Sequence, residues 1–363
     1  MNKIETLYKE WQSLQPLKDQ DQNRLDQKFM LEFNYNSNHI EGNTLTYGQT
    51  EMLLMFGKVV DEANMKDLEE MKASNVGLKM VKEAALNKEL PLTEYFIRNL
   101  HQTLLREDYT VYRQLPNGTN TSYVVHAGQY KTRPNSVITA TGERFEYASP
   151  EETPALMTDL LQWYNQAEHE GNMSPIELAS LFHYRYIRIH PFEDGNGRIS
   201  RLIVNYILYR HGYPMIVVRT KDKEKYLNAL SKSDAVVGKI PSEGAKATLE
   251  QINPFVEYLT NVLYKDLSTN IAIIRDKNRT IWWYNGDLIT FKNQNTINIL
   301  DALNENGKIT VRDLADKLGI NKSAIQKQLK NLQDNGYIIR VGGKSGYWQV
   351  LIVCTTQNSG TNI

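Results

Sequence analysis

Apolar residues recur every three or four positions along much of the chain, which is the spacing of an amphipathic helix. Such patterns run over residues 61–85, from Thr93 to Leu105, from Ser149 onward and from Pro254 onward. Residues 1–35 are polar and helix-forming. The patterning therefore predicts a mainly α-helical protein up to about residue 265.

Within this part, two helices are predicted on either side of a short polar loop. Ser174 and Glu177 form a capping-box pattern with proline at the first helical position, which is a strong helix start. Pro191 ends that helix. Apolar residues return at helical spacing over 199–209, and Gly212 suits the C-terminal cap. The second helix is predicted to be largely buried.

The pattern changes after residue 290. Helices are predicted at 296–303, after the capping residue Thr310 and after the capping residue Asn321. Residues 337–341 and 347–350 then read as two strands around a tight turn. A helix-turn-helix followed by a β-hairpin resembles a winged helix, so we expect a separate domain here.

In winged helices that bind DNA, the third helix enters the major groove. The side chains available for that contact are Lys322, Ser323, Gln326, Lys327 and Lys330, with Arg340 and Lys344 near the wing for phosphates. The basic excess is modest, and many winged helices bind proteins or dimerise instead. DNA and protein therefore both remain as partners of this domain.

The polar loop and the helix after it carry the most informative residues of the chain. Residues 190–201 read H-P-F-E-D-G-N-G-R-I-S-R. Gly195 and Gly197 lack side chains where backbone must approach a ligand closely, and free N–H groups at a helix start attract anions. Arg198 and Arg201 share one helix face and can donate paired hydrogen bonds to phosphate. The pattern predicts a polyphosphate site.

Two residues of the loop would supply the reaction at such a site. Asp194 offers a hard oxygen ligand for Mg²⁺, which needs few protein ligands when phosphates supply the rest. His190 can take a proton from an attacking hydroxyl. Phe192 is expected to bury its ring, and His183 is interpreted as structural. The sequence contains no P-loop and no H-E-x-x-H pattern, and one cysteine cannot build a thiolate zinc site.

Residues 190–201 match, without departure, the signature of Fic-domain proteins, H-P-F-x-[DE]-G-N-G-R-x-x-R. The resemblance covers about residues 25–265 and implies a Fic helical bundle with a β-hairpin flap. It also implies transfer of AMP from ATP to a Ser, Thr or Tyr hydroxyl of a protein, including the enzyme itself, with release of pyrophosphate. A kinase-like branch carries Lys at position 197, so Gly197 favours nucleotidyl transfer.

The resemblance implies a role for each residue of the loop. His190 would be the general base, and Asp194 would hold Mg²⁺ against the α- and β-phosphates. Asn196 and the neighbouring backbone would form an anion hole for the α-phosphate, while Arg198 and Arg201 would hold the β- and γ-phosphates. The full set of expected ATP-binding residues is Gly195, Asn196, Gly197, Arg198, Ile199, Ser200, Arg201, Tyr226 and Leu227.

The last two residues of that set depend on a second, weaker resemblance. Lys225-Tyr226-Leu227-x-x-Leu230 is similar to the family segment that packs on adenine. An aromatic residue at helical spacing can equally belong to the core, so both interpretations of Tyr226 stay open. Asp234 stands where a relative has Asn, which leaves a base contact from that position in doubt.

Residues 126–139, which precede the loop, alternate weakly, have turn residues in their middle and are predicted to form a β-hairpin. In position and in its G-x-Y-K start this segment is similar to the Fic flap, which pairs with the target peptide by strand addition. The residues expected to bind the target are Gly128, Gln129, Tyr130, Lys131 and Val137. An ordinary surface hairpin is the alternative.

Ser37 and Glu41 are four residues apart and fall on one helix face, and Gly42 suits the helix end. By itself this pattern describes a solvated helix end. Beside the Fic signature it is similar to the family's inhibitory pattern, [ST]-x-x-x-E-[GN]. The resemblance implies that Glu41 pairs with Arg201 and keeps the enzyme at low activity. The sequence leaves open whether Glu41 also supports removal of AMP from targets.

Composition bears on the partner and the compartment of the protein. The chain has 363 residues, of which 41% are hydrophobic and 23% charged, with 42 basic and 42 acidic side chains. This balance provides no overall basic field for nucleic acid. The single cysteine, Cys354, excludes an internal disulfide and suits a reducing compartment, and no signal peptide or membrane span is evident. We therefore expect a cytoplasmic protein.

These predictions divide the chain into five parts: an N-terminal helical region with the inhibitory pattern over 1–110, the Fic core over 111–265, a linker over 266–289, the winged helix over 290–352 and a disordered tail over 353–363. The leading hypothesis is an autoinhibited protein adenylyltransferase that uses ATP and Mg²⁺. The alternatives are a DNA-binding transcriptional regulator whose Fic part senses nucleotide, and a Fic enzyme that uses another donor or transfers phosphate. Homodimerisation is implied by the resemblance alone.

Overall fold

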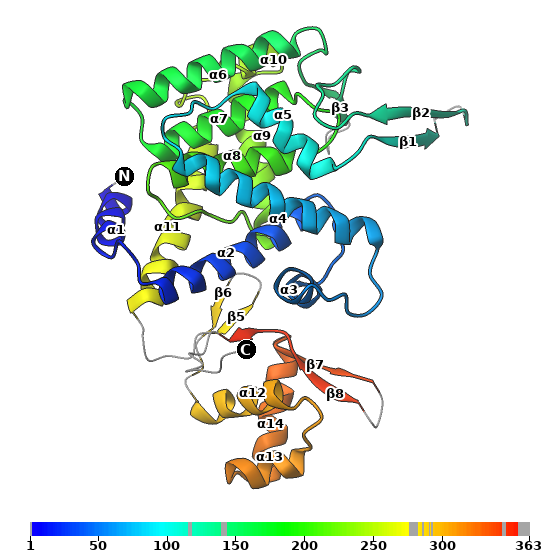
Figure 1. Ribbon diagram of the computed structural model, residues 1–363, viewed down its shortest axis with the longest axis vertical. Coiled ribbons are helices and arrows are strands. Elements are labelled where there is room, and N and C mark those ends of the chain that lie inside the picture. Colours follow the sequence, from blue (N-terminus) through cyan, green and yellow to red (C-terminus); the bar gives the residue numbers. More distant parts are fainter. Residues whose placement is uncertain are drawn as a thin grey trace. The chain divides into compact units, whose positions relative to one another are not determined.

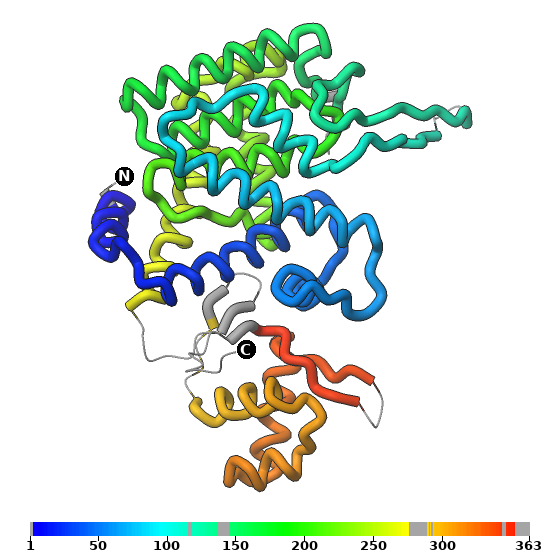
Figure 2. The backbone as a smooth tube through the Cα atoms, in the orientation of Figure 1, coloured from blue at the N-terminus to red at the C-terminus, as the bar shows by residue number. Residues whose placement is uncertain are grey.

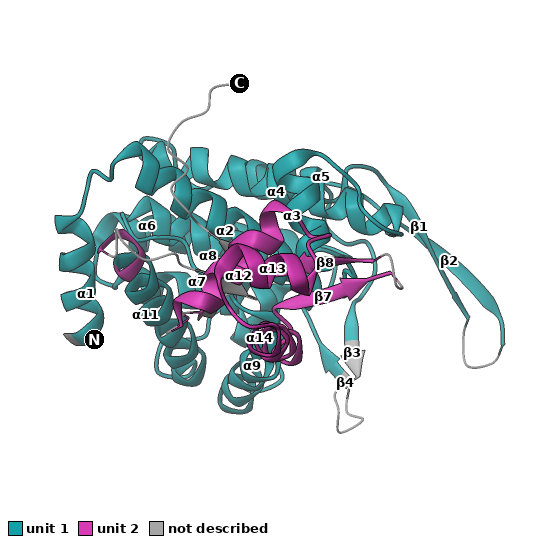
Figure 3. Cartoon of the chain, turned by 90° about the horizontal axis from the view of Figure 1, so that it is seen from below, with its two compact units in different colours: residues 1–271 teal, residues 272–363 magenta. Residues whose placement is uncertain are grey.

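The computed structural model describes residues 2–114, 118–138, 144–275, 282–284, 287–289, 291, 293–342 and 346–354. The chain divides into two compact units, residues 1–271 and 272–363 (Figure 3). Each unit buries its own cluster of apolar side chains. Each therefore has the separate core that defines a domain.

Unit 1 is an assembly of α-helices, as the patterning predicts (Figure 1). Its helices are α1 Asn2–Ser13, α2 Asp19–Ile40, α3 Tyr47–Phe56, α4 Met65–Leu86, α5 Glu94–Leu105, α6 Thr153–Glu170, α7 Pro175–Ile189, α8 Asn196–Arg210, the 3₁₀ helix η1 Thr220–Asp222, α9 Lys223–Val237, α10 Pro241–Gly244 and α11 Asn253–Arg275. The mainly α fold class is confirmed. Within the described ranges, none of the helices combines the length and apolar character that crossing a membrane requires.

Helices α7 and α8 lie side by side in unit 1 and carry the polar loop between them (Figure 1). The N–H of Ser174 donates to the carboxylate of Glu177 at 2.9 Å, so the predicted capping box begins α7. All residues of α8 except Gly197 and Tyr209 are buried. The loop is therefore fixed at both ends by helices of the core.

Two pairs of antiparallel strands accompany these helices. Strand β1, Tyr109–Gln114, pairs with β2, Asn120–Val125, and the two extend past the helices of unit 1 (Figure 2). Strand β3, Ser136–Ile138, pairs with β4, Arg144–Glu146. The bounds of the hairpin predicted over 126–139 are therefore wrong, because only its last residues form a strand and their partner lies beyond it.

Unit 2 contains the expected helix-turn-helix and hairpin. Its elements are α12 Gln294–Glu305, α13 Val311–Leu318, α14 Lys322–Asp334 and the antiparallel strands β7 Ile338–Val341 and β8 Tyr347–Val350. The side chains of Thr310 and Asn321 cap α13 and α14 as predicted. Helices and hairpin share one apolar core. The winged-helix prediction is confirmed.

A further small sheet belongs to unit 2. Strand β5, Trp282–Tyr284, lies between β6, Asp287–Ile289, and β9, Val353–Cys354. Helix α11, β5 and β6 thus occupy much of the segment that we assigned to a linker, and β9 begins the segment assigned to a tail. Strands of two or three residues are too short to leave an alternating pattern in the sequence. Residues 355–363 lie outside the described residues.

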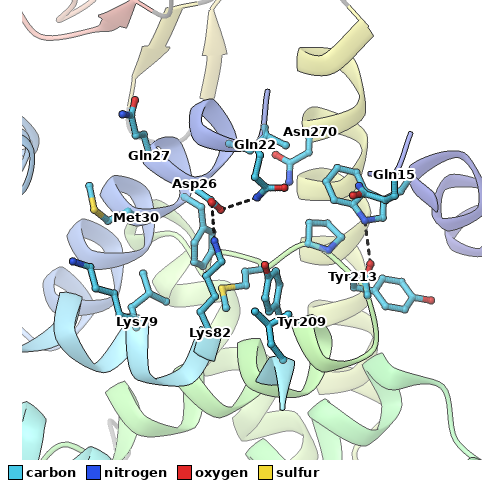
Figure 4. Close-up of a pocket in the computed structure, with 18 of the residues that line it drawn as sticks. Gln15, Gln22, Asp26, Gln27, Met30, Lys79, Lys82, Tyr209, Tyr213 and Asn270 are labelled. Carbon is cyan, nitrogen blue, oxygen red and sulfur yellow. Dashed lines mark hydrogen bonds and ion pairs between the residues drawn. The ribbon is translucent and has the colours of Figure 1, made fainter. Parts of the chain in front are cut away.

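A cavity of about 450 Å³ lies in unit 1, lined by residues of α1, α2 and α4 and by the chain that follows α8 (Figure 4). Its wall is mostly apolar, and the ion pair between Lys82 and Asp26, 2.7 Å long, lies at its side. The N-terminal half of α2 lines one side of this cavity, and the other end of the helix contacts Arg201 of α8.

Candidate active site

The polar loop is shaped by two residues with left-handed backbone conformation. His190 follows the end of α7 with φ 51°, while its N–H still donates to the carbonyl of Tyr186 at 2.9 Å. Gly195 has φ 78° and caps the start of α8. A positive φ at a non-glycine residue is strained and often occurs at functional sites. The loop therefore turns sharply and ends at the free N–H groups of the first turn of α8.

His190 lies between two amides and an aromatic ring. Its Nδ1 accepts hydrogen bonds from the side-chain amides of Asn135 at 2.8 Å and Asn196 at 3.1 Å, and Tyr147 stacks on the ring at 4.1 Å. Burial, and then the charge of Lys131, lower the pKa of His190 to about 3. The imidazole is therefore neutral at ordinary pH, and its Nδ1 lone pair faces hydrogen-bond donors.

The carboxylate of Asp194 is held on both sides. One oxygen accepts the N–H of Gly195 at 2.6 Å, and the other accepts the hydroxyl of Tyr109 at 2.5 Å. Burial opposes ionisation, but Arg198 and these hydrogen bonds keep the pKa of Asp194 below its ordinary value. Among the described residues, no group of three or more His, Cys, Asp or Glu side chains could hold a metal by itself. A lone charged carboxylate at a helix start fits a Mg²⁺ ion that takes most of its ligands from phosphates and water.

The two arginines near the start of α8, Arg198 and Arg201, have different partners. Arg201 is only 3% exposed, and its guanidinium donates to the hydroxyl of Ser37 at 3.0 Å, to the carbonyl of Ser37 at 2.8 Å and to the carboxylate of Glu41 at 2.7 Å. Burial lowers the pKa of Arg201, but Glu41 and Tyr226 more than offset this and raise it above its ordinary value. Arg198 lies 3.7 Å from Asp194 instead. The predicted pairing of Glu41 with Arg201 is thus present.

Glu41 lies directly over the start of α8. It is the C-terminal cap residue of α2, and one of its oxygens overlaps the position that a Cβ at residue 197 would take. A side chain at Gly197 would therefore collide with Glu41. Because the first turn of a helix attracts anions, the carboxylate occupies a favourable place for a negative group.

The two residues of the expected adenine segment have different surroundings. Tyr226 is 3% exposed, and its hydroxyl lies 2.8 Å from Nε2 of His183, whereas Leu227 is 48% exposed. His183 is itself buried, and burial lowers its pKa to about 3, which suits the structural role that we expected. Ile199 and Ser200 are fully buried in α8. A contact between adenine and this segment stays a prediction.

The flap segment, residues 126–138, binds to α5 instead of pairing with itself. The carbonyl of Gly128 accepts from Nε of Arg98 at 2.8 Å, and its N–H donates to Nδ1 of His101 at 2.8 Å. With φ 75°, Gly128 lies so close to α5 that a Cβ would be 3.2 Å from Cβ of Gln102. Backbone groups satisfied in this way are not available for a strand ladder, which explains why the predicted hairpin is displaced.

Lys131 of the flap segment hydrogen-bonds to the end of α7 and the start of the polar loop. Lys131 is 3% exposed, and its ammonium donates to the carbonyls of Ile189 and His190 at 3.0 and 2.9 Å. Burial lowers the pKa of Lys131 to about 8. Tyr130 is half-buried and Gln129 is exposed. The backbone of Val137 lies in β3, and its side chain is outside the described residues.

Several residues at this site were not found from the sequence. Asn135, Tyr109 and Tyr147 contact His190 or Asp194 directly, yet they lie outside the twelve-residue signature. His101 lies on an amphipathic helix, where its apolar neighbours indicate only a core position. None of these residues has a spacing relative to the loop that would have marked it.

Two family models match parts of the chain. Residues 91–208 match the model of the Fic/DOC family. Residues 292–339 match the model of winged helix-turn-helix DNA-binding domains. The first match includes α5, the flap segment, the polar loop and most of α8.

Solved structures and curated proteins give similar results. A Fic domain containing signaling protein from Bacteroides thetaiotaomicron VPI-5482 is 56% identical, with a TM-score of 0.71 over 76% of this chain and 98% of that chain. Fic-1 from C. elegans is 25% identical, with a TM-score of 0.57 over 74% of this chain and 69% of that chain. Protein adenylyltransferase Fic from Drosophila virilis is 29% identical over 233 residues, which are 64% of this chain and 41% of that protein. The chain therefore spans about two fifths of the length of that curated relative.

Proposed function

The chain belongs to the Fic/DOC family and carries a C-terminal winged-helix domain, and from this premise we propose that it is a protein adenylyltransferase held at low activity by its own helix α2. It would transfer AMP from ATP to a Ser, Thr or Tyr hydroxyl of a protein, itself included. One observation carries the proposal: the loop places His190 and Asp194 beside the start of α8, which carries Arg201, and Glu41 is paired with this arginine. Curated relatives named for this activity support the reaction class.

His190 would act on the attacking hydroxyl. The hydroxyl oxygen bonds to the α-phosphorus, the bond to the pyrophosphate oxygen breaks, and the hydroxyl proton passes to Nδ1 of His190. The ring suits this role because it is neutral and its Nδ1 lone pair already accepts hydrogen bonds from Asn135 and Asn196. The target hydroxyl would replace one of these two donors.

The other loop residues would hold the nucleotide. Asp194 would hold Mg²⁺, which, when bound, neutralises charge on the phosphates and favours departure of pyrophosphate. The N–H groups at the start of α8, with Asn196, would hold the α-phosphate, and Arg198 and Arg201 would hold the β- and γ-phosphates. Gly197 leaves space for a phosphate because it has no side chain.

The position of Glu41 supports the regulatory part of the proposal. Its carboxylate takes up hydrogen-bonding capacity of Arg201 and covers Gly197. A γ-phosphate brought to the same place would meet a like charge and would lose its arginine. ATP would therefore bind weakly, or in a pose that does not present the α-phosphate to His190.

Labelled ATP tests the reaction. With Mg²⁺ and ATP labelled at the α-phosphate, we expect weak label on wild-type protein and none on His190→Ala, because a general base contributes about 10²–10⁴-fold. His169→Ala, which replaces an exposed histidine of α6, is the matched control and should label as the wild type does. Protein marked only by γ-labelled ATP would indicate phosphoryl transfer. Absence of both labels would reject the enzymatic proposal.

A second function is favoured by unit 2. Its helix α14 buries Ile325, Leu329 and Leu332 and exposes a polar face. That face contains all five residues predicted to enter the major groove: Lys322, Ser323, Gln326, Lys327 and Lys330. Arg340 is exposed on β7, and Lys344 lies outside the described residues. We propose that this face binds duplex DNA.

Fluorescence anisotropy of a pool of random duplexes tests this second function in the full chain. We expect binding that weakens steeply as salt rises, because neutralised phosphates release counterions. Lys327→Glu/Lys330→Glu should abolish binding and leave AMP labelling unchanged, since both residues lie in unit 2. Absence of salt-dependent binding would favour a protein partner for the winged helix.

A further inference from the structure

Helix α5 carries a row of polar side chains that hold the flap segment. Glu94, Arg98 and His101 are spaced by four and three residues, so they lie on one face of the helix. Glu94 accepts the hydroxyl of Tyr130 at 3.0 Å, and Arg98 donates to the carbonyl of Gly128 at 2.8 Å. The third residue of the row, His101, contacts both the flap segment and the polar loop.

His101 makes hydrogen bonds on both sides of its ring. Its Nδ1 accepts the N–H of Gly128 at 2.8 Å, and its Nε2 lies 3.1 Å from the main-chain carbonyl of Asp194. A backbone N–H can only donate and a carbonyl can only accept. The neutral ring therefore carries its proton on Nε2, and one tautomer satisfies both partners.

Packing holds the ring in this orientation. His101 is fully buried, and its ring stacks on Phe192 with centroids 3.8 Å apart and planes 5° apart. On the loop side, a Cβ at Gly195 would lie 3.5 Å from the ring. Turning the ring would break both bonds and leave two buried backbone groups without partners, which is unfavourable.

We propose that His101 is a positioning residue that joins the target-binding flap to the nucleotide-binding loop, with one ring nitrogen on Gly128 and the other on Asp194. This inference rests on the proposed function, which assigns the metal and phosphates to the loop, and on the expectation from the family resemblance that the flap binds the target. The carbonyl that His101 holds belongs to the residue whose carboxylate would bind Mg²⁺. The N–H of the same peptide group, that of Gly195, donates to this carboxylate at 2.6 Å, so holding the peptide helps to hold the carboxylate.

Two substitutions at His101 each remove one of its two hydrogen bonds and keep the other. In His101→Asn, the side-chain oxygen takes the place of Nδ1 and still accepts from Gly128, but no donor reaches Asp194. In His101→Gln, the side-chain NH₂ reaches the place of Nε2 and still donates to Asp194, but the acceptor for Gly128 is lost. A residue that only filled the core would not distinguish these two variants.

Amide hydrogen exchange of the full chain, measured without nucleotide, reads each bond separately. Loss of one buried hydrogen bond is expected to speed local amide exchange about tenfold. His101→Gln should therefore speed exchange in residues 126–138 alone. His101→Asn should speed exchange in residues 190–200 alone. In a Glu41→Gly background, His101→Gln should raise KM for the protein target and His101→Asn should raise KM for ATP. Equal changes in both segments, or none, would overturn the proposal.

Gly128→Ala keeps the test decisive if the His101 variants do not fold. A methyl group there would lie 3.3 Å from the Arg98 carbonyl, at a φ that side chains rarely adopt, so the flap should leave α5 while the loop keeps its bond to His101. Exchange should then rise in residues 126–138 only, and an unchanged flap would contradict the proposal. Hydrogen exchange needs no ATP, so it tests His101 independently of catalysis. If each variant changes exchange in only one of the two segments but no variant transfers AMP, the proposed function would be rejected. His101 would then still be the residue that bonds both segments in the fold.

Discussion

Replacing Glu41 with glycine is expected to raise AMP transfer about ten- to hundredfold at subsaturating ATP. The wild-type carboxylate lies 2.7 Å from Arg201 and covers Gly197, so under the proposed function it would compete with the γ-phosphate for the same arginine and the same space. A hydrogen bond to a charged group contributes about 1.5–3 kcal/mol, and about 1.4 kcal/mol corresponds to a factor of ten. Initial rates of labelling from α-labelled ATP measure the change.

Three further variants identify the cause of such an increase. Glu41→Gln keeps the shape of the side chain and removes its charge, so its rate should be intermediate. Glu62→Gly removes an exposed loop carboxylate of unit 1 and should match the wild type. The Glu41→Gly/His190→Ala double variant should transfer no label. Equal rates for wild type and Glu41→Gly would show that α2 does not restrain the reaction.

The polar loop could be predicted from the sequence because its chemistry is local. Residues 190–201 are consecutive, and a capping box at Ser174 and a proline at position 191 fix the ends of α7. Their geometry follows from backbone rules that act over a few residues. The pairing of Glu41 with Arg201 joins distant segments, and it was reached only through the family's inhibitory pattern.

The supports of the loop could not be predicted, because each depends on tertiary packing. Asn135 reaches His190 only after the flap segment has docked on α5, and nothing in residues 126–139 alone indicates that docking. Weak alternation suggested a hairpin, but bonds to Arg98 and His101 use the backbone groups that a hairpin would need. Tertiary contacts therefore overrode the local pattern.

Helix positions were predicted better than helix ends. The pattern over 61–85 became Met65–Leu86, and the helix expected from Ser149 begins at Thr153. In the second case, Ser149 and Glu152 exchange hydrogen bonds as in a capping box, and the N–H of Thr153 donates to the carbonyl of Ser149 at 3.0 Å, so the capping residues take up the first turn. Capping of this kind depends on side-chain geometry, which apolar spacing does not report.

Replacing Arg219 with methionine is expected to lower the free energy of unfolding of unit 1 by about 3–5 kcal/mol, the usual cost of removing one partner from a buried ion pair. Arg219 is 3% exposed and donates to Glu32 at 3.1 Å and to Asp266 at 2.6 Å, and both carboxylates are buried. Burial lowers the pKa of Arg219, but the two carboxylates raise it by more than burial lowers it, so the guanidinium stays charged. Without it, Asp266 would lose this ion pair, and Glu32 would keep only its ion pair with Lys28 at 3.5 Å.

Urea unfolding followed by far-ultraviolet circular dichroism measures the loss, with Lys246→Met as the matched control. The Lys246 ion pair with Asp159 is exposed and 3.8 Å long, so its removal should cost less than about 1 kcal/mol. Adding Asp266→Asn to Arg219→Met should restore part of the stability, because Asp266 loses its ion pair with Arg219, whereas Glu32 keeps Lys28 at 3.5 Å. Equal costs for the two methionine variants would contradict the account.

Glu32 lies on α2, the helix that carries Glu41, so Arg219→Met should also loosen the contact with Arg201 and raise AMP transfer. Stability of the core and restraint of the active site would then share one buried arginine.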